Sequence, residues 1–219
     1  MRKSCLIGLL LLVLVIPILV YAHQPRIVPD GLTVIENPEV SQAFYGTLKG
    51  NPHYYQITSE EAFTLYVSIL VPDLEGIGKD VSVTVTSEQD SEVLASLDGL
   101  GYEWTALYEP FAGDSYYKGP EAKTVIGAGT YIIEVSSIDN EGKYVLVVGE
   151  KEEFSLNEIL HTIRTLPSLK RDFFEKSPLT AFFNLFGLFL FIPLLLIVII
   201  ILVLRRIIRK RRTPTQPRN

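Results

Sequence analysis

The feature that most constrains this chain is an apolar run near its C-terminal end that is followed at once by a basic cluster. Residues 181–204 contain no charged side chain. A helix of this length, at about 1.5 Å per residue, spans roughly 36 Å. A hydrocarbon core is about 30 Å thick, so the run is predicted to cross a membrane as one helix. The basic cluster extends from Arg205 to Arg212.

A second apolar run, Leu6–Tyr21, lies near the N-terminus and follows two basic residues. It is shorter than the first run and is followed by Ala22, a small residue that suits a signal peptidase. We therefore interpret residues 1–22 as a signal peptide that is removed, with an uncleaved signal anchor as the alternative. Cys5 is the only cysteine and lies in this segment. Cleavage leaves a mature chain without thiols, disulfides or cysteine metal ligands.

Charge is distributed unevenly along the chain. Residues 23–180 contain all 25 acidic residues and 11 Lys and Arg, a net charge of −14, whereas residues 205–219 carry +7. Because cytoplasmic flanks are enriched in Lys and Arg, this pattern predicts a cell-membrane protein with a cytoplasmic C-terminus and its N-terminal domain outside. The basic tail is expected to contact the lipid bilayer, with no nucleic-acid partner.

The long segment between the two apolar runs shows the pattern of β-strands. Apolar and polar residues alternate over residues 63–70 and 81–86, which places one set of side chains on a buried face. Turn sequences such as residues 49–52 and 139–142 separate the strands. Short strands spaced in this way predict an all-β antiparallel sandwich. The other predicted strands are residues 42–48, 53–57, 93–97, 104–108, 123–126, 130–136 and 143–148.

Several of these strands resemble the bacterial pre-peptidase C-terminal domain. The similar pattern is a glycine turn followed by a tyrosine-containing strand, as in Ala128–Val135 and Gly142–Val147. The resemblance covers roughly residues 40–149, and it implies a small jelly-roll-like sandwich of the kind appended to secreted enzymes. No protease is fused to it here, so the resemblance implies a non-catalytic accessory or binding module. The other similar segments are residues 46–48, 54–57 and 63–67.

The periodicity becomes helical after the sandwich. Ser155 and Glu158 form a capping box at a helix start. Pro167 is expected to end this helix, and Ser168 to begin a second short one. One apolar stripe predicts a stalk that packs on the sandwich or lies along the headgroups, with docking of a partner protein as the alternative. The stripe comprises Leu156, Ile159, Leu160 and Ile163.

The predicted organisation has six segments. They are a signal peptide, an N-terminal extended segment, an extracytoplasmic β-sandwich, a juxtamembrane helical stalk, a transmembrane helix and a basic cytoplasmic tail. Their bounds are residues 1–22, 23–39, 40–150, 151–179, 180–204 and 205–219, in that order.

The sequence offers few residues with catalytic chemistry. It contains no nucleophile elbow, phosphate loop or HExxH motif, and only three histidines. Cleavage after Ala22 would make His23 the mature N-terminus, where its amine and imidazole can chelate copper(II), with His53 as a second ligand. This arrangement resembles the N-terminal-histidine copper sites of secreted β-sandwich proteins and oxidative polysaccharide enzymes. Copper is the one cofactor that we consider, and whether the protein is an enzyme stays open.

A second candidate site is the aromatic stretch of residues 102–121. Carboxylates are interleaved with the aromatic residues, and prolines and glycines predict a long irregular loop. Aromatic faces beside carboxylates suit sugar stacking, cation capture or contact with a protein. The alternative is that the loop only folds over one end of the core. The candidate ligand-binding residues are Tyr102, Trp104, Tyr108, Phe111, Tyr116 and Tyr117.

The membrane run contains one strongly polar side chain, Asn184, and Gly187 follows on roughly the same helix face. We predict that these two residues make a membrane contact, with headgroups or with a neighbouring helix. The sequence thus predicts a single-pass, non-catalytic binding or accessory module for a protein or glycan ligand. The alternatives are a copper-binding or copper-dependent oxidative protein that uses His23, and a structural subunit that a membrane-protein partner recognises through the stalk and transmembrane helix.

Overall fold

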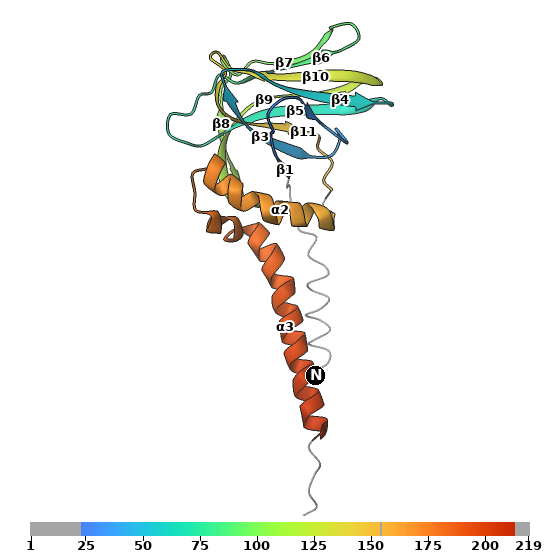
Figure 1. Cartoon of the computed structure of the whole chain (residues 1–219), viewed down its shortest axis with the longest axis vertical. Coiled ribbons are helices and arrows are strands. Elements are labelled where there is room, and N and C mark those ends of the chain that lie inside the picture. Colours follow the sequence, from blue (N-terminus) through green and yellow to red (C-terminus); the bar gives the residue numbers. More distant parts are fainter. Residues whose placement is uncertain (1–22, 154, 213–219) are drawn as a thin grey trace, which may run out of the picture.

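The computed structural model describes residues 23–153 and 155–212, with side chains up to residue 209. The predicted signal peptide and the last seven residues of the predicted basic tail, 213–219, lie outside these residues. The described chain forms a β-sandwich, a group of short helical segments beneath it, and one long C-terminal helix (Figure 1).

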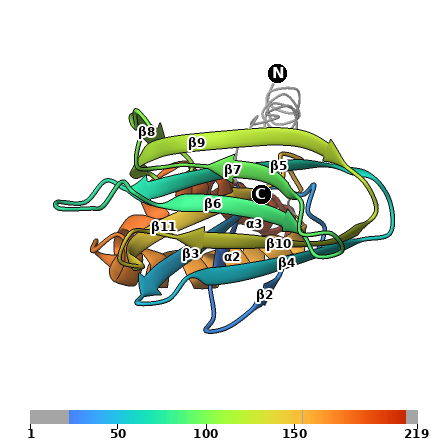
Figure 2. The same cartoon turned by 90° about the horizontal axis from the view of Figure 1, so that it is seen from above.

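Two sheets pack face to face to form the sandwich (Figure 2). The six-stranded sheet has the order β1-β3-β11-β5-β9-β8, and the five-stranded sheet has the order β2-β4-β10-β6-β7. The predicted antiparallel sandwich is confirmed, except that the edge strands β1 and β2 run parallel to their neighbours. The strands are β1 Gln24–Ile27, β2 Thr33–Val34, β3 Gln42–Lys49, β4 His53–Ser59, β5 Phe63–Pro72, β6 Ser82–Ser87, β7 Val93–Leu97, β8 Thr105–Glu109, β9 Asp114–Ile126, β10 Gly129–Ser136 and β11 Glu141–Val148.

The strand β9 is much longer than predicted. The prediction of an irregular loop over residues 102–121 is therefore wrong. Most of that stretch forms the β8–β9 hairpin. Gly119 and Pro120, two of the residues that suggested a loop, lie within β9. Together they lie opposite the single residue Ile69, where the pairing of β9 with β5 shifts register. A β-bulge accommodates both residues without ending the strand.

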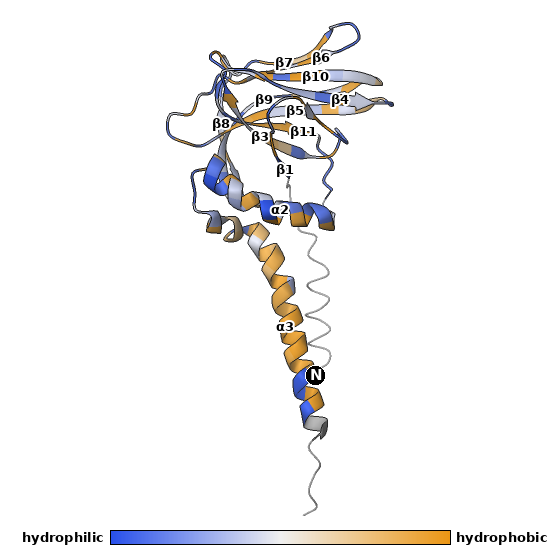
Figure 3. Ribbon diagram, in the orientation of Figure 1, coloured by the Kyte–Doolittle hydropathy of each residue, from blue (hydrophilic) through white to orange (hydrophobic). Residues whose placement is uncertain are grey.

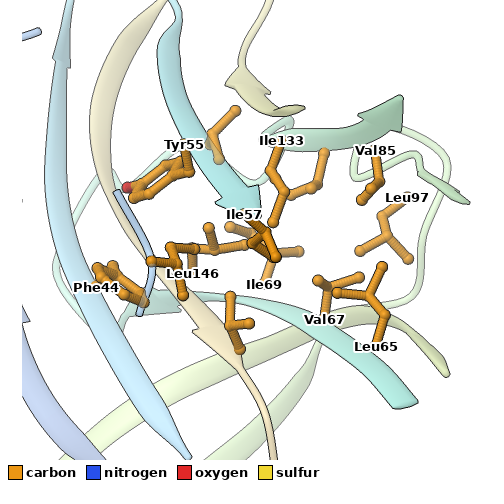
Figure 4. Close-up of a cluster of buried hydrophobic side chains, with 14 of the residues drawn as sticks. Phe44, Tyr55, Ile57, Leu65, Val67, Ile69, Val85, Leu97, Ile133 and Leu146 are labelled. Atoms are coloured by element: carbon orange, nitrogen blue, oxygen red, sulfur yellow. The ribbon is translucent and has the colours of Figure 1, made fainter. Parts of the chain in front are cut away.

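The core between the sheets follows from the alternation of side chains. In β4, Tyr55 and Ile57 point inward and are fully buried, whereas the intervening side chains point outward. Side chains of both sheets meet in this core (Figure 4). The residues labelled there are Phe44, Tyr55, Ile57, Leu65, Val67, Ile69, Val85, Leu97, Ile133 and Leu146.

A second core covers the other face of the six-stranded sheet. Val145 and Val147 of β11 point away from the first core and pack against the helical segments. The sheet is therefore buried on both faces, which explains the uninterrupted apolar sequence at the end of β11. The helical segments are α2 Leu156–Ser168, the π-helical η1 Leu169–Phe173, the 3₁₀-helical η2 Pro178–Phe182 and the long α3 Leu185–Arg212.

One of the two hydrogen bonds of the predicted capping box at α2 is confirmed: Ser155 Oγ accepts the N–H of Glu158 at 3.2 Å. The predicted end of α2 at Pro167 is met to within one residue, since α2 ends at Ser168 and η1 begins after it, although Ser168 makes no side-chain cap. The chain continues into the wider π-helical turn of η1, which tolerates a residue that breaks the regular hydrogen-bond ladder.

The helix α3 begins at Leu185, so residues 181–184 of the predicted membrane run precede this helix rather than form its first turn. Its stretch Leu185–Arg209 is long and apolar enough to cross a membrane. Figure 3 shows this apolar surface along most of α3, with hydrophilic residues near the end farthest from the sandwich. The structure thus contains a possible membrane anchor with the sandwich at one end.

Gly46 makes room for a buried tyrosine and gives a test of the core. A Cβ at this position would lie 2.4 Å from Cζ of Tyr144, which pairs with Gly46 across β3 and β11. We expect Gly46→Ala to lower the free energy of unfolding by about 1–3 kcal/mol, because the ring must move within a packed core. Urea unfolding of the purified protein measures this. Gly127→Ala is the control, because nothing lies within 4 Å of its added Cβ, and equal stability of the two variants contradicts the prediction.

Candidate functional site

The β8–β9 hairpin ends in a turn that reaches the start of α3, and we call residues Glu109–Asp114 the hairpin tip. The Glu109 carboxylate accepts the backbone N–H groups of Phe111 at 2.6 Å and Ala112 at 2.8 Å. Burial raises the pKa of Glu109, and these two donors oppose the shift. Gly113 has a φ of +74°, and a Cβ there would lie 3.2 Å from Cβ of Asn184. Glycine therefore permits both the turn and its close approach to α3.

The hairpin tip is bonded directly to Asn184, which precedes α3, and to Phe186 in its first turn. Asn184 Nδ2 donates to the carbonyl of Ala112 at 2.6 Å, and the N–H of Phe186 donates to the carbonyl of Phe111 at 3.0 Å. The rings of Phe111 and Phe186 meet edge to face, with centroids 5.4 Å apart. Asn184 Oδ1 also accepts the N–H of Gly187 at 3.0 Å, which caps the start of α3.

A buried ion pair joins the hairpin tip to η1. Lys170 Nζ lies 2.6 Å from Asp114 Oδ2, and both side chains are 1% exposed. The same ammonium donates to the carbonyl of Ala112 at 2.6 Å, and Lys176 Nζ lies 3.0 Å from Asp114 Oδ1. Burial lowers the pKa of Lys170, while the hydrogen bond to Asp114 and its negative charge oppose this shift. Separating the tip from η1 would break this pair, so it favours the docked arrangement.

Aromatic side chains pack around this ion pair. The hydroxyl groups of Tyr45 and Tyr116 lie 3.0 Å apart. The ring of Phe174 meets that of Tyr116 at 5.4 Å and that of Tyr45 at 6.1 Å, between centroids. Burial raises the pKa of both tyrosines. We call the hairpin tip and the side chains that hold it the junction; these side chains are Tyr45, Tyr116, Lys170, Phe173, Phe174, Lys176, Asn184 and Phe186.

The predicted membrane contact at Asn184 and Gly187 lies within this junction. Both polar side-chain atoms of Asn184, Nδ2 and Oδ1, make hydrogen bonds within the molecule. A Cβ at Gly187 would lie 1.8 Å from the carbonyl oxygen of Phe182, so the glycine lets η2 pack tightly on α3. The structure therefore gives these two residues an intramolecular role.

Of the six aromatic residues predicted to bind a ligand, the structure packs four within the molecule and exposes two. Phe111 and Tyr116 belong to the junction. Trp104 Nε1 donates to a backbone carbonyl at 2.9 Å, and Tyr117 is half-buried, with Lys79 Nζ 3.2 Å from the centroid of its ring. The two that remain at the surface are Tyr102, 45% exposed, and Tyr108, 62% exposed.

The two predicted copper ligands are not brought together. His23 faces the helical segments, where its ring contacts Ser41 Oγ. His53 Nδ1 lies 2.7 Å from the hydroxyl of Tyr144, whose side chain is in the core between the sheets. The two imidazoles therefore lie on opposite sides of the six-stranded sheet, and burial lowers the pKa of each. Within the described part of the chain, no three His, Cys, Asp or Glu side chains are placed to hold one metal ion.

A shallow recess lies on the five-stranded sheet, which is the sheet farther from α3 (Figure 1). Its volume is about 570 Å³, and Tyr54 and Ile132 line it from the neighbouring strands β4 and β10. Tyr54 is 42% exposed. An aromatic face bordered by polar groups suits the ring of a sugar or a flat side chain of a protein. The polar residues that line the recess are Asp30, Lys49, Asn51 and His53.

Sequence reasoning missed both the ion pair and the recess. Asp114 and Lys170 are far apart in the chain and belong to no local motif. One signal was present, since Leu166, Phe173 and Phe174 stand three or four residues from Lys170 and would share one side of a helix with it. The signal for the recess was the pair Tyr54-Tyr55, because consecutive side chains in a strand point to opposite faces and one tyrosine must face outward.

Comparison with known proteins gives a loose structural likeness. The sequence matches no protein-family model and no curated protein. The fold is similar to the pre-peptidase C-terminal domain of a collagenase from Bacillus anthracis, with 18% identity, a TM-score of 0.36, and coverage of 55% of this chain and 96% of that domain. It is also similar to CorA, a surface-associated copper-binding protein of Methylomicrobium album BG8, with 8% identity, a TM-score of 0.31, and coverage of 58% and 100%. The first of these likenesses is to the family that the sequence resembles, and neither likeness bears on ligand or chemistry.

The buried ion pair gives a stability test. Asp114→Asn leaves the Lys170 ammonium buried without its counter-charge, so we expect the free energy of unfolding to fall by about 3–5 kcal/mol. Lys170→Met should cost less, because Lys176 still pairs with Asp114. Urea unfolding of the full chain in micelles measures both variants. Asp172→Asn, which removes the exposed pair with Arg171, is the matched control and should change nothing measurable. An Asp114→Asn variant as stable as this control contradicts the role of the pair.

Proposed function

We propose that the protein is a single-pass membrane protein whose extracytoplasmic β-sandwich is a binding or accessory module held in one orientation over the bilayer. The observation that carries this proposal is the junction, in which the hairpin tip is bonded to Asn184 and to the first turn of α3. A domain joined to its membrane anchor only by a flexible linker would not need such contacts. Here, the Ala112 carbonyl of the tip accepts a hydrogen bond from Asn184 Nδ2 at 2.6 Å. The Phe111 carbonyl accepts one from the N–H of Phe186 at 3.0 Å.

The junction supports a fixed orientation because its contacts come from remote parts of the chain. The strand before α2 is β11, yet the residues that hold α3 belong to the β8–β9 hairpin. A second connection between the sandwich and α3 therefore exists besides the covalent one. The ion pair between Asp114 and Lys170 is buried, so bending at the junction would expose or separate two charges.

This orientation turns the five-stranded sheet, with its recess, away from the membrane helix. We propose this recess as the ligand site, with a glycan as the ligand. Tyr54 offers an aromatic face on which a sugar ring can stack, while Asp30, Lys49 and Asn51 offer hydrogen bonds to its hydroxyl groups. The acidic sandwich and the basic residues after the membrane run support an extracytoplasmic position for this site.

Distance measurements test the fixed orientation. Nitroxide labels at Val125→Cys, in the sandwich, and Leu195→Cys, in α3, occupy side chains that are 74% and 60% exposed. In full-length Cys5→Ser protein in lipid nanodiscs, pulsed electron resonance should give one narrow distance distribution. Adding Asp114→Asn and Asn184→Ala should broaden it, because the tip loses its ion pairs through Asp114 and its hydrogen bond from Asn184. Asp172→Asn should leave it narrow, and a broad distribution without any junction variant refutes the proposal.

A glycan array tests the ligand site with the same nanodisc preparation. We expect binding to a subset of oligosaccharides, weakened about three- to tenfold by Tyr54→Ala because a stacking face is lost. Tyr108→Ala is the control, since this exposed tyrosine lies on the β8–β9 hairpin and not in the recess. Loss of binding in Tyr108→Ala alone would move the site to that hairpin, and no binding to any glycan contradicts a glycan ligand.

A further inference from the structure

The helix α2 presents apolar side chains on two sides. Thr162, Thr165 and Leu166 are buried against the six-stranded sheet and its neighbours. Leu156 and Leu160, one turn apart, are 80% and 51% exposed. At about 100° per residue, these two leucines point away from the buried side. Packing on the sandwich therefore does not account for them.

The structure splits the apolar stripe that the sequence predicted for this helix. Ile163 packs against the second core, which agrees with a stalk that contacts the sandwich. Leu156 and Leu160 are exposed and belong to neither core. An exposed pair of leucines on an otherwise docked helix indicates a second environment that this side of α2 meets.

The position of α2 indicates what that environment is. Figure 1 shows α2 lying across the upper end of α3, beneath the sandwich. The helix packs against η2, which leads directly into α3. Two further apolar side chains at this level are exposed, Leu179 at 67% and Phe183 at 83%. The apolar stretch of α3 begins at Leu185, so the exposed leucines of α2 lie where the membrane-spanning surface starts.

We propose that α2 is an interfacial helix whose outward side, formed by Leu156 and Leu160, lies in the headgroup layer of the bilayer that α3 crosses. Amphipathic helices of this kind lie in the plane of the membrane with their apolar side at the boundary between headgroups and acyl chains. Asn157 and Arg164 flank the two leucines on the exposed side and suit the polar headgroups. The proposal rests on α3 spanning a membrane, as the proposed function does.

Lipid fits this surface better than a second protein. The helix α2 packs against η2, and between η2 and α3 lie the exposed apolar side chains of Phe183 and Leu185, the latter the first residue of α3. A partner protein bound here would have to lie between α2 and the membrane surface. The junction also fixes α2, η1 and η2 relative to α3, so the leucines stay at one depth. In this arrangement, α2 supports the sandwich on the membrane beside its single anchor.

Depth measurements with nitroxide labels test the proposal. The variants Leu156→Cys and Leu160→Cys carry labels on the outward side of α2, in full-length Cys5→Ser protein with one copy per nanodisc. Ile138→Cys, at a side chain 75% exposed in a turn of the sandwich, is the aqueous control, and Ile197→Cys in α3 is the membrane control. We compare the accessibility of each label to oxygen, which partitions into lipid, with that to a water-soluble nickel complex. Both α2 labels should show a ratio about threefold or more above that of the Ile138 label.

Each outcome decides the proposal. A Leu160 label with the same ratio as the Ile138 label overturns it. A Leu160 label shielded from both reagents also overturns it, because protein rather than lipid then covers the surface. If the Ile197 label is accessible to nickel, α3 is not embedded and the anchor fails together with this proposal. In a further variant, Leu160→Glu should move the Leu156 label toward the aqueous ratio, whereas Asp172→Asn should not.

Discussion

The arrangement of this protein depends on the buried ion pair between Asp114 and Lys170. Neither charge has access to water, and the ammonium also bonds to the carbonyl of Ala112. Each partner belongs to a different part of the molecule, the hairpin tip and the helical segment η1. The two charges pair with each other only when these parts are docked, and docking places Asn184 and Phe186 against the same tip. One polar contact inside an apolar cluster thus sets how the sandwich meets the membrane helix.

The six-stranded sheet makes this docking possible because both of its faces are apolar. In β11, Tyr144 and Leu146 point toward the core between the sheets, while Val145 and Val147 point toward the helices. If the outer face of the six-stranded sheet were polar and exposed to solvent, the helices would be joined to the sandwich only through the covalent chain. The helical segments therefore belong to the folded domain, and what the sequence suggested as a stalk is a layer of the structure. That layer in turn positions the outward side of α2 at the level where α3 begins.

The parts of the fold that local patterns specify were predictable. The period-two alternation located most strands to within a few residues, and Ser155 caps α2 as its position before Glu158 indicated. Predictions failed where a distant contact decided the outcome. Gly119 and Pro120 were interpreted as part of an irregular loop, yet they form a bulge in β9 because β5 lies alongside. No local pattern showed that Asn184, interpreted as a membrane contact, also donates to a carbonyl 72 residues earlier in the chain.

The sequence by itself determined the class of fold, the position of the membrane-spanning run and the unequal charge of the segments beside it. These properties follow from composition and short periodicities, which each segment carries without its neighbours. Only the tertiary structure decided which aromatic residues are packed and which are exposed, and that His23 and His53 lie on opposite sides of a sheet. It also decided that Lys170 meets Asp114 and that Tyr54 borders a recess. The physical reason is that side chains far apart in sequence acquire partners only when the strands and helices pack, and no local pattern encodes that packing.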